Sequence, residues 1–89
     1  MTKKLINLEQ EWSEKIKQLL VGRRIVDVSY MTDTEAEGSG WDFKPIQIKL
    51  DDGTLLTPTQ DDEGNDGGSL FTNIKKLPII PTMCGKAND

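Results

Sequence analysis

The residues best suited to chemistry lie in one short segment, residues 59–71, which reads TQDDEGNDGGSLF. Carboxylate and amide oxygens are the ligands that Ca²⁺ and Mg²⁺ prefer, and several must converge within about 2.0–2.6 Å of the ion. Closely spaced acidic residues among glycines can provide such a set. The candidate metal ligands are therefore Asp61, Asp62, Glu63 and Asp66, with Ca²⁺ or Mg²⁺ as the ion.

The same segment also has a purely structural interpretation. Compared with the twelve-residue calcium loop of EF-hands, and starting at Asp62, Gly64 replaces the third-position ligand and Asn73 replaces the bidentate Glu. Asp and Asn side chains accept hydrogen bonds from nearby backbone N–H groups, and glycine takes the positive φ of tight turns. We therefore favour a turn that returns Leu70 and Phe71 to the core, then a partner-binding rim, and then a metal loop.

The usual catalytic groups are missing from the sequence. It contains no histidine, and Cys84 is its only cysteine, so neither a Ser-His-Asp triad nor an ordinary zinc site can be assembled. No glycine-rich phosphate-binding motif occurs. We expect no catalytic residues and no cofactor, and we interpret Cys84 as incidental.

The charge is distributed unevenly along the chain. Residues 1–26 have six Lys/Arg and three Glu, a net +3, whereas residues 27–74 have eleven Asp/Glu and two Lys, a net −9. Such an acidic segment repels nucleic acid and attracts basic proteins. There is no apolar stretch of about 20 residues that would span a bilayer. We expect a cytoplasmic protein with no nucleic-acid or membrane partner.

Two aromatic residues, Trp41 and Phe43, follow a glycine-rich stretch. They suit an exposed anchor for a partner protein, although core or core-rim positions are favoured in so small a chain. The candidate partner-binding residues are Trp41, Phe43, Asp62, Glu63, Asn65 and Asp66.

The clearest predicted element is an amphipathic helix from residue 7 to residue 21. Asn7 and Gln10 have the spacing of a capping box, and Gly22 suits the position after a helix. Apolar residues recur every three or four positions and would lie on one face: Leu8, Trp12, Ile16, Leu19 and Leu20.

The rest of the chain predicts strands and short turns. Residues 23–31 alternate like a strand with one buried face, and residues 32–38 predict a short helix with a Thr32–Glu35 capping box that stops at Gly38. Residues 44–59 predict a β-hairpin with a type I′ turn at Asp52-Gly53. Residues 69–74 suggest a helical turn, and residues 75–83 an extended outer strand.

Together these elements predict an α+β fold. One N-terminal amphipathic helix packs on a small, mostly antiparallel sheet of three or four strands with a central β-hairpin. Eighty-nine residues suffice for a single small domain over residues 1–89, with residues 1–6 and 85–89 expected to fray.

Several motifs resemble a family of small uncharacterised proteins from bacteria and their phages. The pattern YMT-x-x-EAE, GW, DDGT and D-x-EGN-x-x-x-LF corresponds here to Tyr30–Thr32, Glu35–Glu37, Gly40-Trp41, Asp51–Thr54 and Asp62–Phe71. The resemblance covers roughly residues 20–81 and implies a complete small protein rather than a fragment of an enzyme. It implies no substrate or mechanism. Thr57 departs from the pattern, where the family has an aromatic residue before the proline.

The sequence therefore favours a non-enzymatic protein-interaction module that uses the acidic loop and the neighbouring aromatic surface. Its expected partner is an unidentified protein, and a basic one would be attracted by the acidic segment. The alternative is a divalent-metal-binding domain, extending to a metal-dependent phosphoester hydrolase that needs only carboxylates and water. Mimicry of DNA by the acidic segment is a weaker third hypothesis.

Overall fold

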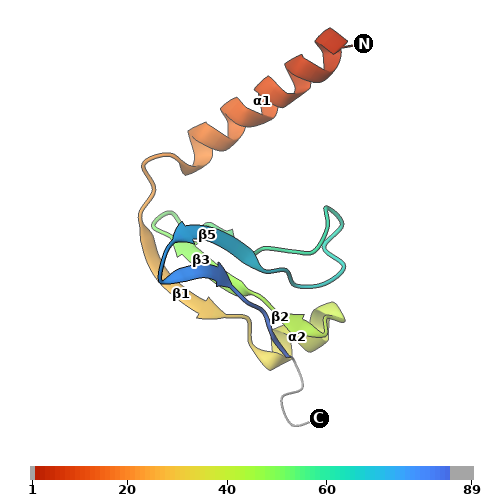
Figure 1. Ribbon diagram of the computed structural model, residues 1–89, viewed down its shortest axis with the longest axis vertical. Coiled ribbons are helices and arrows are strands. Elements are labelled where there is room, and N and C mark those ends of the chain that lie inside the picture. The colour runs from red at the N-terminus through yellow and green to blue at the C-terminus, as the bar shows by residue number, and fades with distance from the viewer. Residues whose placement is uncertain (1, 85–89) are drawn as a thin grey trace.

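The structure is a computed structural model that describes residues 2–84, with side chains described from residue 8 onward. Within residues 2–84, two helices and seven short strands follow one another (Figure 1). In order they are α1 (Thr2–Leu20), β1 (Ile25–Tyr30), α2 (Asp33–Ser39), β2 (Phe43–Lys44), β3 (Ile46–Leu50), β4 (Leu55–Leu56), β5 (Leu70–Ile74), β6 (Leu77–Ile80) and β7 (Met83–Cys84).

The strands form three small antiparallel units. β3 lies between β1 and β4 in a three-stranded sheet, β2 pairs with β7, and β5 pairs with β6. The predicted α+β class, with an N-terminal helix and a hairpin-type sheet, is confirmed. The predicted helical turn over residues 69–74 is wrong, because this segment is strand β5 and its pairing with β6 satisfies the backbone of both strands.

Few of the described side chains are buried. They lie directly after β1, in α2, directly before β3 and at the two ends of β3: Met31, Ala36, Pro45, Ile46 and Leu50. The hydroxyl of Tyr30 donates to the carbonyl of Pro81 at 2.8 Å and so joins β1 to the chain after β6. β1 was expected to bury one face. Val26 and Val28 lie on that face, but their side chains are 57% and 50% exposed.

The end of α2 and the turn between β3 and β4 both differ from the sequence prediction. The Thr32–Glu35 capping box is present in full, but α2 runs past Gly38 to Ser39, and Gly40, with a φ of 73°, caps its C-terminal end. The predicted type I′ turn at Asp52-Gly53 is wrong, because a type I′ turn needs positive φ at both central residues. Of the two, only Gly53 has a positive φ, 90°. The loop consists of three residues, 51–53. The Gly53 N–H donates to the Leu50 carbonyl, and the Leu50 N–H donates to the Thr54 carbonyl.

α1 extends away from the strands (Figure 1). It begins at Thr2, so Asn7 lies inside the helix and does not cap it. The predicted packing of this helix on the sheet is not observed in the part of α1 whose side chains are described, where Leu8, Trp12, Ile16 and Leu19 are exposed. A link at residues 21–24 sets its direction. Gly22 has a φ of 85°, and Arg23 donates from its backbone N–H to Leu20 and from Nε to the Leu19 carbonyl. Residues 85–89, expected to fray, lie outside the described residues.

Candidate functional site

The acidic loop, residues 59–68, is closed at its neck by backbone hydrogen bonds. Thr59 and Gly67 form an antiparallel bridge, and the Gln60 N–H donates to the Asp66 carbonyl at 3.0 Å. The Gly68 N–H donates to the Pro58 carbonyl at 3.0 Å. The loop is therefore a structured reversal of the chain, as the turn interpretation predicts.

Asp61 organises the inside of this loop. Its Oδ1 accepts the backbone N–H groups of Glu63 at 3.0 Å and Asn65 at 3.2 Å, and its Oδ2 accepts the Asn65 amide at 2.8 Å. The Asn65 side-chain hydrogen bond, followed by the Asn65 backbone N–H, lowers the pKa of Asp61 below its ordinary value of 3.8. These bonds favour the ionised carboxylate. Asp61 is thus an acceptor for the loop's own donors.

Asp66 and Trp41 attach the loop to the segment before β3. Asp66 Oδ1 accepts the Phe43 N–H at 3.0 Å and the Gly67 N–H at 2.8 Å. The indole N–H of Trp41 donates to the Gly64 carbonyl at 2.9 Å. These contacts join residues 23 positions apart, so the loop is docked at two points rather than held only by its neck.

Gly67 brings the loop into close contact with β2 and Pro45. A Cβ added at Gly67 would lie 2.6 Å from the Phe43 carbonyl oxygen and 2.6 Å from Pro45 Cδ. Real Cβ atoms do not approach so closely, so the absence of a side chain is what permits this docking. Gly67 is itself buried.

The four metal-ligand candidates do not form a ligand cage. Within residues 2–84, no group of three or more acidic, cysteine or histidine side chains is placed to hold a metal ion. Asp61 and Asp66 turn their oxygens toward backbone N–H groups, and Asn65 also donates to Glu63 Oε1 at 3.3 Å. These hydrogen bonds make Asp61, Glu63 and Asp66 parts of a turn.

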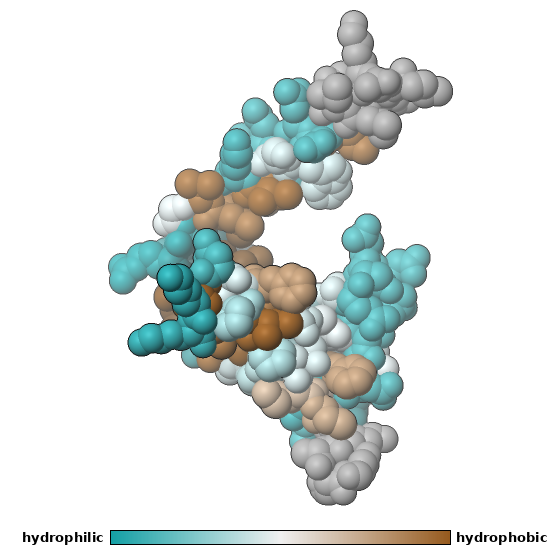
Figure 2. Space-filling model, viewed as in Figure 1, coloured by the Kyte–Doolittle hydropathy of each residue, from teal (hydrophilic) through white to brown (hydrophobic). Residues whose placement is uncertain are grey.

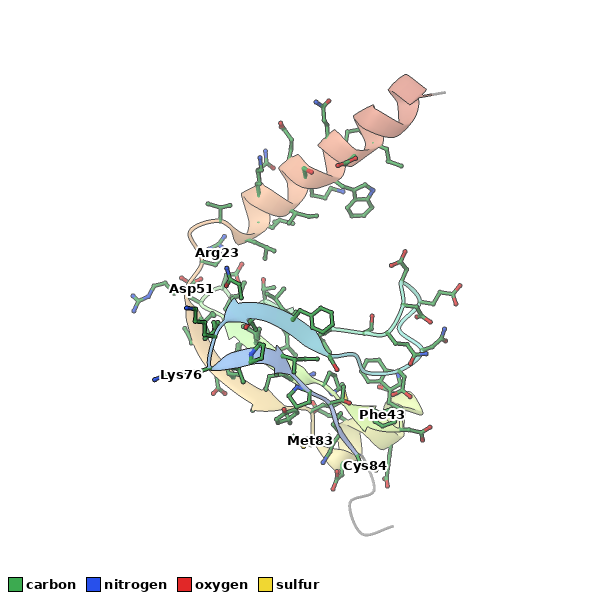
Figure 3. The ribbon with its side chains drawn as sticks, in the orientation of Figure 1. Arg23, Phe43, Asp51, Lys76, Met83 and Cys84 are labelled. Carbon is green, nitrogen blue, oxygen red and sulfur yellow. The ribbon has the colours of Figure 1, made fainter. Side chains whose placement is uncertain are left out.

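The partner-binding candidates divide into two groups. Trp41 is half-buried, Asp66 accepts backbone N–H groups, and the Asn65 side chain donates to Asp61, so these three side chains shape the loop or hold it in place. Phe43 is 46% exposed in β2, opposite Cys84 of β7 (Figure 3). Asp62 and Glu63 are exposed at the loop tip. Only the second group presents surface to another molecule, and it is largely acidic.

A larger exposed surface lies on α1. We call it the α1 stripe, and its side chains are 47–57% exposed: Leu8, Trp12, Ile16 and Leu19. In Figure 2, apolar surface appears on α1 and again on the strands, with a hollow between the helix and the rest of the molecule. The sequence periodicity identified these residues as an apolar face, but assigned them to the core.

The β5–β6 hairpin carries a second exposed apolar surface. Phe71 and Ile79 are directly opposite in the register and therefore share one face of the hairpin. Phe71 is 82% exposed and Ile79 is 40% exposed. We call this pair the hairpin face. Sequence reasoning missed it, because it expected Phe71 to return to the core.

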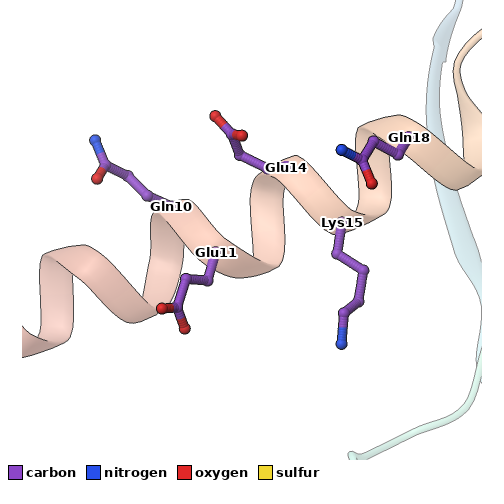
Figure 4. Close-up of a pocket in the computed structure, with 5 residues that line it drawn as sticks. All are labelled: Gln10, Glu11, Glu14, Lys15 and Gln18. Atoms are coloured by element: carbon purple, nitrogen blue, oxygen red, sulfur yellow. The ribbon is translucent and has the colours of Figure 1, made fainter.

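A shallow hollow also lies along the polar side of α1 (Figure 4). Its lining comes from one helix alone: Gln10, Glu11, Glu14, Lys15 and Gln18. It is open helix surface rather than an enclosed cavity that would surround a substrate. At its edge the Lys15 ammonium lies 5.3 Å from the centre of the Trp12 ring, a cation–π contact beside the α1 stripe.

Comparison of the chain with protein-family models, with curated proteins and with solved structures gave no match. In the described part of the chain, neither helix is long and apolar enough to cross a bilayer. The features that remain to indicate a function are the two apolar surfaces and the docked acidic loop.

Proposed function

We propose that this protein is a non-enzymatic protein-interaction module whose apolar surfaces are covered by another polypeptide chain. The observation that carries the proposal is the exposure of the α1 stripe on a well-formed helix of 19 residues. An amphipathic helix gains most of its stability from packing its apolar face. A stripe left open to water is the form in which helices are recognised by apolar grooves or by other helices.

The total surface supports the same proposal. The chain exposes 7309 Å² for a mass of 10.0 kDa, whereas a compact monomer of this mass exposes about 5,200 Å². Its radius of gyration is 15.6 Å, compared with about 12 Å for a compact domain of this length. The excess of about 2,000 Å² exceeds the roughly 800 Å² that each partner contributes to a standard interface.

The acidic loop gives this surface a charged flank. Asp62 and Glu63 lie exposed at the loop tip, within the segment of net −9 that spans residues 27–74. Charges at the rim of an interface accelerate association and select partners by sign more than they add affinity. The α1 stripe and the hairpin face would supply the buried area, and the loop would favour a basic partner surface.

Affinity capture with matched variants tests the proposal. Ile16→Glu places a charge in the α1 stripe, and Gln18→Glu makes the same charge change on the polar side of the same helix. We expect wild type and Gln18→Glu to recover one polypeptide in stoichiometric amount, whether a second copy or another protein, and Ile16→Glu to lose it. Equal recovery by all three proteins, or recovery by none, contradicts the proposal.

A further inference from the structure

We propose that the chain covering the α1 stripe is a second copy of this protein, in a two-fold symmetric dimer to which α1 of each copy contributes. This inference rests on the proposed function and names its partner. In a two-fold dimer the same surface is used by both copies, so a residue on α1 of one copy contacts the body of the other copy, and the reverse contact follows.

The size of the open surface fits such a dimer. Each chain exposes about 2,000 Å² more than a compact monomer of its mass. Obligate homodimers bury about 2,000–5,000 Å² in total and have more apolar interfaces than transient complexes. If each of two chains buried half of its excess, the total buried area would be about 2,000 Å², which is within the range of obligate homodimers. The α1 stripe and the hairpin face supply the required apolar character.

The charge pattern is complementary to itself. α1 has four Lys and three Glu, a net +1, whereas residues 27–74, which include β2 to β5 and the acidic loop, have eleven Asp/Glu and two Lys, a net −9. A symmetric dimer places α1 of each copy, with its small positive net charge, against the negative body of the other. The attraction is therefore counted twice in the dimer, and both complementary charges are already present in one sequence.

The link after α1 argues against the helix folding onto its own strands. Arg23 donates to the Leu19 carbonyl at the helix end, and its guanidinium lies 3.8 Å from Asp51 and 3.4 Å from Asp52 in the β3–β4 turn (Figure 3). The backbone of Arg24 accepts the Asp51 N–H at 2.9 Å. These bonds hold the helix end to the far end of the sheet and direct α1 outward.

The length of α1 also suits a dimer in which each α1 lies on the body of the other copy. A helix of 19 residues is about 28 Å long, and the two shorter dimensions of the molecule are 30 and 28 Å. One α1 therefore reaches across the body of a second copy. The α1 stripe runs from Leu8 to Leu19 and so extends along about 17 Å of the helix.

Light scattering coupled to gel filtration tests the dimer, with the full chain followed from micromolar to millimolar concentration. We expect wild type and Gln18→Glu to have twice the 10.0 kDa mass of one chain. Ile16→Glu, and Trp12→Glu as a second variant, should fall to the mass of one chain. The indole N–H signal of Trp41, which bonds Gly64 in the docked loop, reports in every variant that the body is folded.

Three results would overturn the inference, and they separate it from the proposed function. A dimer that persists in both stripe variants shows that the stripe is not its interface. A wild-type monomer whose Trp12 fluorescence, obtained by difference from Trp12→Phe, is readily quenched by acrylamide refutes the second copy but leaves the stripe open for another protein. A wild-type monomer with Trp12 shielded shows α1 folded on its own chain and refutes both proposals.

Discussion

The acidic loop and α1 are opposites in the way they are held. The loop has no regular helix or strand, yet its side chains and backbone are bonded to one another and to Trp41 and Phe43. α1 is a continuous helix of 19 residues, yet its apolar face lies open. Regular secondary structure is therefore a poor guide to which part of this chain is fixed by tertiary contacts.

The loop and α1 also differ in where their stability comes from. Bonds within the acidic loop and its docking are intramolecular, so the stability they provide is independent of protein concentration. Burial of the α1 stripe by a second chain depends on concentration by mass action. Perturbations of the loop should change the folding of the body, whereas perturbations of the stripe should change association.

The largest expected effect is from Gly67→Ala in the docked loop. The new methyl group would meet the Phe43 carbonyl and Pro45 at 2.6 Å, and such overpacking destabilises by about 3 kcal/mol. Chemical denaturation measures the loss. Gly38→Ala is the matched control, because Gly38 lies within α2 with open space around it, and a gain of about 0.5–1 kcal/mol is expected there. Equal effects at both glycines would show that the loop is not docked as described.

A smaller loss is expected when Asp61 is replaced by Ala. Three donors from Glu63 and Asn65 lose their acceptor, so the loop should open while the core remains folded. Amide exchange at Glu63 and Asn65 should accelerate, and the melting temperature should fall. Asp62→Ala removes a neighbouring charge and should leave both quantities nearly unchanged. If Asp62 proved the more sensitive position, the assignment of Asp61 as organiser of the loop would be wrong.

The pH dependence should follow from the same carboxylate. Hydrogen bonds from Asn65 lower the folded-state pKa of Asp61 below 3.8, so the ionised form stabilises the loop. This contribution is complete above the unfolded pKa and is lost as the pH falls through the lower, folded pKa. An NMR titration of the Asn65 amide should have its midpoint below pH 3.8, and a midpoint at or above that value would contradict the geometry.

The smallest effect is expected at the link. Arg23→Ala removes a largely exposed interaction with the β3–β4 turn, and exposed ion pairs contribute little to stability. The melting temperature should hardly change, but in the monomeric Ile16→Glu background α1 should sample more directions. Small-angle scattering would detect a radius of gyration that departs from 15.6 Å. Lys44→Ala, which removes the ion pair between Lys44 and Asp33 of α2, is the control and should leave that radius unchanged.

The sequence predicted the elements whose signals are local. The Thr32–Glu35 box, the β3–β4 hairpin and the strand before α2 follow from capping, alternation and turn residues. The spacing of Leu70, Phe71 and Ile74 resembles a helical turn, and only pairing with β6 makes this segment a strand. The pairing depends on β6, which lies outside the short segment over which the periodicity of residues 69–74 is judged.

Only the local features of the candidate site could be predicted from the sequence. Asp and Asn between glycines indicate a turn, and the structure has one. The bond between Trp41 and Gly64 spans 23 positions and cannot be inferred from either segment alone. For α1, periodicity identified an apolar face but said nothing of what covers it. The shortage of buried side chains in the body became visible only in three dimensions.

Hydrogen exchange measured at several protein concentrations tests the central claim most directly. If a second copy covers the α1 stripe, amides near the middle of α1 such as Ile16 should gain protection as concentration rises. Amides of the docked loop such as Asn65 and Gly68 should stay unchanged. Strong protection of α1 that is the same at the lowest and highest concentrations would contradict the account, because it would mean that the helix packs on its own chain.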